Sequence, residues 1–246
     1  MLQNKFISGS QLKWIAIITM FLDHTAKIIS FQPPIIAAVP YESTNEPFYE
    51  ATQAIFTVCT TLGRLAFPIF CFLLVEGFIH TSNRNKYAFR LLIFAFLSQI
   101  PYSLAFSHQL FDFRELNVFF TLLIGFLVVM GLDKFKKFSF KNVFYSIGIV
   151  ALGVELAEWL QTDYGGNIDV LLIVALYLLR YNLLYKSLVG SLIILQNSFF
   201  GIFSFFILSF YNGERGKQWK YFFYLFYPVH LLLLVGIKRF IVVPYF

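Results

Sequence analysis

The sequence predicts an all-α fold, a polytopic bundle of transmembrane helices, and two properties of the chain support this. Of its 246 residues, 59% are hydrophobic and only 13% charged, with a mean hydropathy of +0.72. A soluble domain carries about 25% charged residues. Long apolar runs also recur along the whole chain, with short polar turns between them. We therefore expect a single integral-membrane domain over residues 1–246.

A transmembrane helix needs about 20 mainly apolar residues, and most of the apolar runs approach or exceed that length. The runs fall at residues 12–31, 55–79, 88–107, 116–132, 143–160, 168–179, 184–210 and 221–240. The seventh run is long enough for one helix, or for two short helices that turn near Gln196, Asn197 and Ser198. One helix there gives eight spans, and two give nine.

The charge of each loop predicts its side, because lysine and arginine gather on the cytoplasmic side of membrane proteins. The first loop, residues 32–54, has three acidic residues and no lysine or arginine, which places it outside. The basic turns after the second, fourth and sixth runs then lie inside, as does the N-terminus. The basic turn at 212–217 lies inside only if the seventh run is two helices, about 184–197 and 198–211. We therefore favour about nine spans, with eight as the alternative.

Charge and cysteine content exclude several kinds of partner. The net charge of +6 is spread over short loops, with no basic run interleaved with aromatic residues. We therefore expect membrane lipids and no nucleic acid as partners. The first apolar run lacks a cleavage site and reads as a retained span. Cys59 and Cys71 lie in one apolar run without metal-ligand spacing, so no metal site is expected.

Ionisable residues inside the apolar runs mark the candidate catalytic site. Asp23 and His24 are adjacent in the first run, where each ionisable group costs roughly 2.5–3.5 kcal/mol to insert. Arg64 and His230 each lie nine residues into their own runs, about 14 Å deep in a helix. These four side chains are therefore expected to line one central cavity. In the alternative reading, Asp23 and Arg64 form a structural ion pair and the histidines bond to the backbone.

These residue types suit acyl transfer. A histidine with a nearby carboxylate acts as a general base that deprotonates a hydroxyl or amine. Arg64 would stabilise the oxyanion that develops when such a group attacks a thioester. Because neighbouring residues on a helix point about 100° apart, Asp23 is free to serve either His24 or Arg64.

A second group of candidates lies at the cytoplasmic ends of the spans. Glu76 ends one span and Arg90 begins the next, so we expect the two to approach and form a salt bridge. In the alternative reading, Arg84 and Arg90 bind an anionic phosphate or headgroup together with the turn Asn212–Gly216, which contains Arg215.

A third group is expected on the outer side, around the ends of the fourth to sixth spans. Its members carry carboxylate, amide or phenol groups: Asn117, Glu155, Glu158, Asp163, Tyr164 and Asp169. Glu155 and Glu158, spaced i,i+3 on one helix face, suit a cationic or amino-bearing acceptor. In the alternative reading, the carboxylates are ordinary helix-end residues at the membrane interface.

Several multi-residue motifs, in order along nearly the whole chain, resemble the TraX family of membrane proteins. The motifs are Leu12–Ala16 with Met20–His24, Gly63–Phe70 with Val75–Phe78, Tyr87–Leu91 with Ser98–Tyr102, Leu116–Thr121, Tyr211–Gly216, and Phe226–His230. The family is named for a protein that N-acetylates the pilin of a conjugative pilus. It is similar to the membrane acyltransferases that modify surface sugars, in which a first-span histidine is the favoured catalytic residue.

The resemblance implies roles for individual residues and partners. His24 corresponds to the first-span histidine, and Arg64 to the arginine of the Gly-Arg-x-Ala-Phe-Pro motif. Acetyl-CoA, or another acyl-CoA, is implied as donor. A surface polymer or pilin-like protein is implied as acceptor, and a bacterial inner membrane as location.

The sequence leaves three functions open, from different classes. The first is an acyltransferase, in the simplest case an acetyltransferase, with His24, Asp23 and Arg64 as catalytic residues. Its donor- and substrate-binding candidates are Glu76, Arg90, Asn117, Asp163, Tyr164, Asn212, Arg215 and His230. The second is a proton-coupled transporter or flippase, because intramembrane Asp, His and Arg also build proton relays. A non-catalytic assembly factor for a pilus or other surface appendage is a third alternative.

Overall fold

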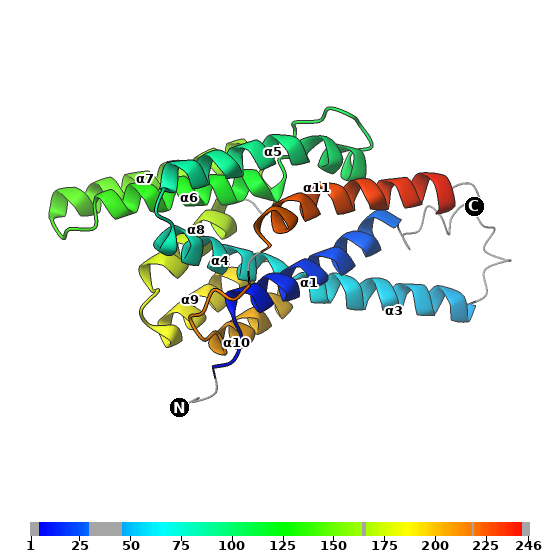
Figure 1. The fold of residues 1–246 in the computed structure, drawn as a ribbon, viewed down its shortest axis with the longest axis horizontal. Coiled ribbons are helices and arrows are strands. Elements are labelled where there is room, and N and C mark those ends of the chain that lie inside the picture. The colour runs from blue at the N-terminus through cyan, green and yellow to red at the C-terminus, as the bar shows by residue number, and fades with distance from the viewer. Residues whose placement is uncertain (1–4, 30–45, 164–165, 218, 243–246) are drawn as a thin grey trace.

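The computed structural model describes residues 5–29, 46–163, 166–217 and 219–242, and these are mostly helical (Figure 1). In chain order the helices are α1 (Gly9–Ile29), α3 (Glu46–Gly63), α4 (Ala66–His80), α5 (Arg84–Phe106), α6 (Val118–Lys134), α7 (Phe140–Trp159), α8 (Gly166–Leu178), α9 (Leu183–Leu195), the 3-10 helix η2 (Phe200–Ile202), α10 (Phe203–Ser209), α11 (Lys220–Ile237) and the π-helical turn η3 (Lys238–Val242). These ranges contain no β-strand. The predicted class, an all-α membrane bundle, is confirmed.

The helices follow the predicted apolar runs closely. Four are long and apolar enough to cross a membrane: Glu50–His80, Arg84–Phe106, Phe140–Trp159 and Tyr221–Phe240. Ile168–Leu178, Leu183–Leu195 and Phe200–Ser209 are shorter apolar helices. Helix α1 has 21 residues but carries charged side chains, and α6 has 17. The chain is therefore a membrane protein whose long helices are accompanied by several short ones.

The predicted division of the seventh run is also confirmed. Helix α9 ends at Leu195 and η2 begins at Phe200, so the run forms two short helices. The turn that follows α10 is bonded to the N-terminal segment, through Ile7 N to Phe210 O (3.1 Å), Asn212 N to Ile7 O (3.0 Å) and Gly9 N to Glu214 O (2.8 Å). The basic turn and the start of α1 therefore lie on the same side of the bundle.

The second run differs from its prediction in two ways. Its helix begins at Glu46, in the segment predicted to be an outer loop, rather than at Ile55. The run is also broken into α3 and α4 at Arg64 and Leu65. Pro68 explains the break, because it has no N–H to donate to the carbonyl of Arg64 one turn earlier. The rest of the predicted outer loop, residues 32–45, is outside the described residues.

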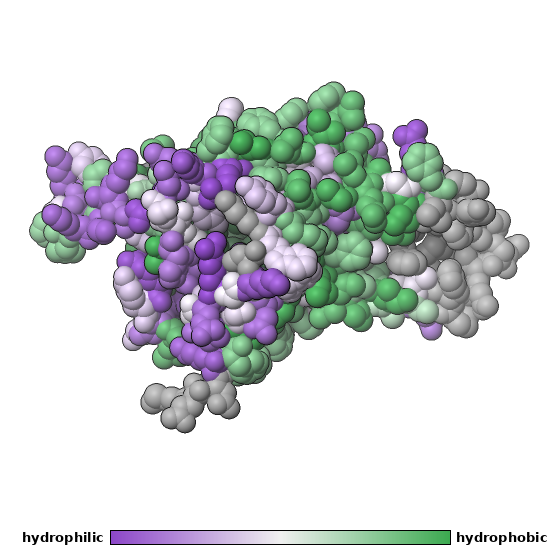
Figure 2. All heavy atoms as spheres, viewed as in Figure 1, coloured by the Kyte–Doolittle hydropathy of each residue, from purple (hydrophilic) through white to green (hydrophobic). Residues whose placement is uncertain are grey.

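Polar and apolar surfaces separate along the long axis of the molecule. Figure 2 shows hydrophilic residues gathered at the end that carries the turn between α6 and α7, and hydrophobic residues over α5, α11 and α3. The lysines of that turn, predicted to be cytoplasmic, are Lys134, Lys136, Lys137 and Lys141. This end also holds the basic turn after α10, so one end of the bundle collects the basic turns.

Helix packing connects the two ends of the chain through α11, which packs on both α1 and α5. Helix α1 packs on α3, α4 and α11, and α4 packs on α8 and α10. Helix α5 packs on α6 and α11. Helices α4 and α5 both contact α6 but make little contact with each other, so they diverge after the short turn that joins them. This divergence leaves room for a cavity at the end of the bundle that collects the basic turns.

Side-chain caps define where several helices start. Asn83, Asn117, Ser139 and Asn182 each accept a backbone N–H from the first turn of α5, α6, α7 and α9 respectively. Such a cap contributes about 1 kcal/mol. Asn117 therefore has a structural role at the start of α6 in addition to its predicted position near the outer side.

Candidate functional site

Two histidines from opposite ends of the sequence meet inside the bundle. Nδ1 of His24, on α1, lies 2.8 Å from Nε2 of His230, on α11. The two rings are parallel within 2° and their centroids are 5.1 Å apart. His230 is 4% exposed, whereas His24 is partly exposed. This contact confirms the prediction that the two residues reach the same depth.

The bonds around His230 determine which nitrogens carry protons when both rings are neutral. Nδ1 of His230 lies 2.8 Å from the carbonyl oxygen of Phe226, which only accepts, so this nitrogen donates. Nε2 of His230 then holds a lone pair, which accepts the Nδ1–H of His24. The other nitrogen of His24, Nε2, is therefore unprotonated and able to take a proton. Within the described ranges, no hydrogen bond occupies it.

Aromatic rings hold this histidine pair, His24 and His230, in place. Phe106 and Tyr227 lie against the His24 ring, with centroids 5.6 and 6.0 Å away. Phe226 stacks on His230 at 4.8 Å. These contacts pack around both rings and oppose their rotation away from the hydrogen bond that joins them.

Asp23 has a different partner from either of those considered from the sequence. Its Oδ2 lies 2.7 Å from Nζ of Lys27, one turn later on α1. Asp23 is 7% exposed, and its Oδ1 has no hydrogen-bond partner in the described part of the chain. A Cβ added to Gly63 would lie 2.3 Å from the Cβ of Asp23, so α3 approaches α1 here only because residue 63 is glycine. Asp23 thus serves neither His24 nor Arg64 directly.

Arg64 follows this close contact and lies in the break between α3 and α4. Its position beside Gly63 confirms that it reaches the level of Asp23. Its guanidinium, however, points to the turn between α9 and η2, where Nη1 lies 3.4 Å from Oδ1 of Asn197. The alternative of an Asp23–Arg64 ion pair is therefore wrong. The predicted role of Arg64 at an oxyanion stays a prediction.

A cavity of about 730 Å³ lies between the diverging helices at the end where the basic turns collect. Its polar wall carries four cationic side chains: Lys13, Lys86, Arg90 and Arg215. Its apolar wall includes Met20, Phe119 and Tyr227. We call this cavity the basic cavity. It extends to the residues that surround the histidine pair, because Tyr227 also contacts the His24 ring. The sequence did not indicate Lys13 or Lys86 as part of a site.

Glu76 and Arg90 both line the basic cavity, but the salt bridge predicted between them is absent from the described structure. Glu76 instead accepts a hydrogen bond from the Tyr211 hydroxyl (3.1 Å) and lies 3.9 Å from Nδ1 of His80. The prediction was wrong because α4 and α5 diverge and leave the cavity between these side chains. Nε of Arg90 is buried without a hydrogen-bond partner in the described ranges. Arg90 therefore keeps one unsatisfied donor at the wall of the basic cavity.

The turn after α10 reaches the basic cavity through Tyr211, Gly213 and Arg215. Asn212 shapes the turn rather than lining the cavity, because its Oδ1 accepts the backbone N–H of Glu214 (2.8 Å). Gly213 has φ +82°, which favours glycine. Burial, with the nearby Glu76 carboxylate, raises the pKa of Tyr211. Tyr211 therefore stays protonated and able to donate to Glu76.

Arg84, a candidate for anion binding, is already engaged. Its Nη1 lies 2.6 Å from Oδ2 of Asp133 at the end of α6. Its guanidinium also stacks over the Phe78 ring at 4.0 Å. Asp133 in turn accepts from the Tyr177 hydroxyl (2.9 Å). Arg84 thus links α5 to α4 and α6, and of these two α5 arginines it is Arg90 that lines the basic cavity.

On the outer side, Asn117 is fully buried and its side-chain atoms are satisfied within the protein. Its Nδ2 donates to the carbonyl of Ala95 and to Oε1 of Gln99, both at 2.8 Å, and its Oδ1 accepts from Phe119 N (3.0 Å). Gln99 also donates to the backbone carbonyl of Asp112 (2.8 Å). These bonds fix the loop between α5 and α6. Asn117 is therefore accounted for as a structural residue.

The outer carboxylates do not form one cluster. Glu155 and Glu158 are exposed on α7. Asp169 is fully buried near Thr162, whose hydroxyl donates to Oδ2 at 3.4 Å. Tyr164 is outside the described residues. The carboxylates of the predicted acceptor group therefore do not form one binding site.

Asp163 lies near the central charges. The dense protein around it raises its pKa to about 6, although its own side chain is exposed. Lys27 and Arg64 oppose the rise, and Asp23 and Glu115 add to it, so all four are close enough to interact. Asp163 is therefore within electrostatic range of the Asp23–Lys27 pair.

Neither Lys27 nor Gly63 was predicted from the sequence as part of the site. Lys27 was detectable, because a lysine four residues after an aspartate lies on the same helix face. Gly63 gave no comparable signal, since its role depends on which helix packs against it. Within the described residues, no group of three or more metal-ligating side chains is present.

Comparison with known proteins places the chain in one family. Residues 8–238 match the family described as "TraX protein". The chain is 30% identical over 262 residues to "Probable fimbrial assembly protein FimC, serogroup H1" of Dichelobacter nodosus, covering 98% of this chain and 100% of that protein. No solved structure matches the chain significantly. The matched region contains both histidines, Asp23, Arg64 and the residues of the basic cavity. The chain therefore belongs to the TraX family.

Proposed function

We propose that the chain is an integral-membrane acyltransferase of the bacterial inner membrane. It transfers an acyl group, in the simplest case acetyl, from acyl-CoA to an amine or hydroxyl of an envelope or surface acceptor. The observation that carries the proposal is the hydrogen-bonded histidine pair, which leaves Nε2 unprotonated on a His24 ring that lies against Tyr227 of the basic-cavity wall.

The side chains of the basic cavity suit an acyl-CoA donor. Its phosphates need cationic donors, and Lys13, Lys86, Arg90 and Arg215 lie on the cavity wall. Its pantetheine arm and acyl group need a less polar path, which Met20 and the aromatic residues at the inner wall offer. Nε of Arg90 adds a buried donor that has no hydrogen-bond partner in the described residues.

The proton path follows from the relay. Nε2 of His24 takes the proton of the acceptor amine or hydroxyl as that group attacks the thioester carbonyl. A bond forms between the thioester carbonyl carbon and the acceptor nitrogen or oxygen, and the carbon–sulfur bond breaks. The proton then passes from His24 to the leaving thiolate. His230 accepts from Nδ1–H throughout and stabilises the positive charge that His24 carries between the two transfers.

The name of the Dichelobacter relative favours an acceptor in a fimbria or similar appendage. The same name also suits a second candidate, a non-catalytic assembly factor. The buried ion pair and histidine pair favour the enzyme, since an assembly scaffold needs no ionisable groups at such a cost.

Mass spectrometry of envelope polymers and surface proteins tests the proposal, comparing a deletion strain with its parent. We expect one acceptor to lose the mass of an acetyl or longer acyl group. The purified protein in nanodiscs should restore that group from labelled acetyl-CoA. An unchanged envelope together with solute flux driven by a proton gradient would establish the transporter instead. An unchanged envelope with missing appendages would establish the assembly factor.

Substitution of the two arginines at the basic cavity should weaken donor use. We expect Arg90→Gln and Arg215→Gln each to raise the KM for acetyl-CoA about tenfold or more, because each removes a charge-assisted contact to phosphate. The kcat should change little, since neither arginine is placed at the reacting atoms. Steady-state kinetics with acetyl-CoA measures both constants.

Two controls sharpen this prediction. Arg239→Gln removes one exposed positive charge from η3, outside the basic cavity, and should leave the KM unchanged. A short acetyl thioester without the nucleotide phosphates should react equally well with the Arg90→Gln protein and the parent. Equal sensitivity to both donors would contradict phosphate binding at Arg90.

A further inference from the structure

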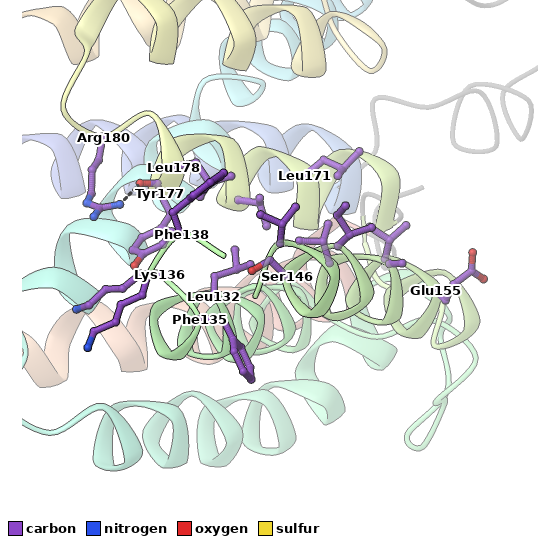
Figure 3. A pocket seen from close by; sticks show the side chains of 17 residues that line it. Leu132, Phe135, Lys136, Phe138, Ser146, Glu155, Leu171, Tyr177, Leu178 and Arg180 are labelled. Atoms are coloured by element: carbon purple, nitrogen blue, oxygen red, sulfur yellow. Dashed lines mark hydrogen bonds between the residues drawn. The ribbon is translucent and has the colours of Figure 1, made fainter. Parts of the chain in front are cut away.

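A second cavity, of about 820 Å³, lies on the side of the bundle between α6, α7 and α8 (Figure 3). It shares no lining residue with the basic cavity. Aliphatic side chains from the three helices form most of its wall, among them Leu132, Val150, Leu171 and Val174. We call it the lateral groove. It plays no part in the proposed acyl transfer.

One end of the lateral groove is basic. Lys136, Lys137 and Arg180 line it there, and Figure 3 shows Lys136 and Arg180 at the end opposite Glu155. Lys137 has no ion-pair partner in the described part of the chain. Lys136 lies 3.4 Å from Oδ1 of Asp133, a carboxylate already shared with Arg84. The positive charge at this end therefore exceeds the local negative charge.

Arg180 is held in position at the same end. Its Nη1 donates to the carbonyl of Tyr177 (2.6 Å), and its guanidinium lies 4.4 Å from the rings of both Tyr177 and Tyr181. A guanidinium fixed in this way keeps further N–H groups free for an anion, because it has five in all. The end of the lateral groove thus combines one fixed and two flexible cationic groups.

The dimensions and position of the lateral groove match a single lipid chain. On α7 its lining runs from Val143 to Glu155, which is about 18 Å of helix. One leaflet of hydrocarbon is about 15 Å thick. The outer face of α7 is apolar and exposed, with Phe144 at 76% and Leu152 at 72%, as expected for a helix that faces lipid. Clustered basic residues next to a span attract anionic headgroups.

We propose that the lateral groove binds an anionic phospholipid of the cytoplasmic leaflet. Its headgroup phosphate contacts Lys136, Lys137 and Arg180, and one acyl chain lies along α7 between α6 and α8. Charge at one end and aliphatic lining along the length together select this ligand over a zwitterionic lipid, whose own cation would meet the lysines.

Native mass spectrometry of the full chain in detergent micelles tests this, with phosphatidylglycerol and phosphatidylcholine of identical chains as probes. We expect one phosphatidylglycerol to be retained per chain at concentrations where phosphatidylcholine is not. The double variant Lys136→Gln/Lys137→Gln should weaken phosphatidylglycerol binding about tenfold or more. Ala151→Trp, which fills the groove without changing charge, should weaken it comparably.

A matched control removes the same charge from the same turn. Lys134→Gln/Lys141→Gln deletes two lysines that do not line the lateral groove, and should change binding by at most about threefold. Equal loss in this control would show diffuse surface charge and overturn the site. Unchanged binding in Ala151→Trp, or equal retention of the two lipids by the parent protein, would overturn it as well.

Discussion

Replacing His24 by alanine is expected to lower the rate of acetyl transfer about 10²–10⁴-fold, the range typical of a lost general base. Binding of acetyl-CoA should persist, because the basic cavity keeps its cationic side chains. The measurement is single-turnover transfer of labelled acetyl by protein in nanodiscs, alongside equilibrium binding of the donor. The effect should therefore appear in the chemical step and leave donor affinity near the parent value.

Two further variants separate catalysis from packing. His230→Phe keeps an aromatic ring against Phe226 but removes the lone pair that accepts from His24, so the rate should fall while the fold persists. Its pH–rate profile should also shift, which a purely structural role would not produce. His108→Asn changes an exposed histidine in a loop with φ 56°, and should leave the rate unchanged. Full transfer by a folded His24→Ala protein would exclude His24 as the base.

Gly63→Val is expected to destabilise the bundle by about 3 kcal/mol, the upper part of the usual range for overpacking. A Cβ at residue 63 would meet the Cβ of Asp23 at 2.3 Å and its Oδ1 at 2.8 Å, so α3 must move away from α1. This movement also displaces Arg64 and disturbs the Asp23–Lys27 pair. Unfolding in detergent, followed by circular dichroism, measures the change in free energy.

Gly148→Val is the matched control for this effect. A Cβ added at residue 148, on α7, meets no atom within 4 Å. The same substitution there should change the free energy of unfolding by less than about 0.5 kcal/mol. Equal destabilisation of the two variants would show that the cost comes from valine in a helix and not from contact with Asp23.

At the centre of the bundle, the adjacent residues Asp23 and His24 have separate partners on different helices. His24 turns toward α11, where His230 sets its tautomer. Asp23 turns toward α3 and pairs with Lys27. The Asp23–Lys27 pair therefore lies within α1 where α3 packs against it, while His24 and His230 join α1 to α11.

Much of the fold was predictable because membrane insertion requires long apolar runs and places basic residues mainly on one side of the membrane. The nine apolar segments, including the two short helices in place of residues 184–210, follow from hydropathy and the basic turn after them. The break between α3 and α4 at Arg64 also has a local cause, Pro68, although we did not predict it. These features depend on the lipid environment or on a single turn of helix, so the sequence alone is sufficient to predict them.

The partners of the buried polar groups depended instead on how helices pack. Depth along each helix indicated that His24 and His230 share a level, and the two do meet. Depth alone did not show that Arg64 turns to Asn197, that Glu76 pairs with Tyr211 and His80, or that Asn117 caps α6. Those outcomes depend on the rotation of each helix about its axis and on the divergence of α4 from α5.

The sequence by itself thus determined the class of protein, its helices, the side on which its basic turns gather and the candidate base His24. The tertiary structure decided which groups meet: His24 with His230, the Asp23–Lys27 pair against Gly63, and the side chains around the basic cavity. The physical reason is that hydropathy is a property of each segment, whereas hydrogen bonds and cavities arise between segments distant in the chain. Only packing brings residue 24 to residue 230.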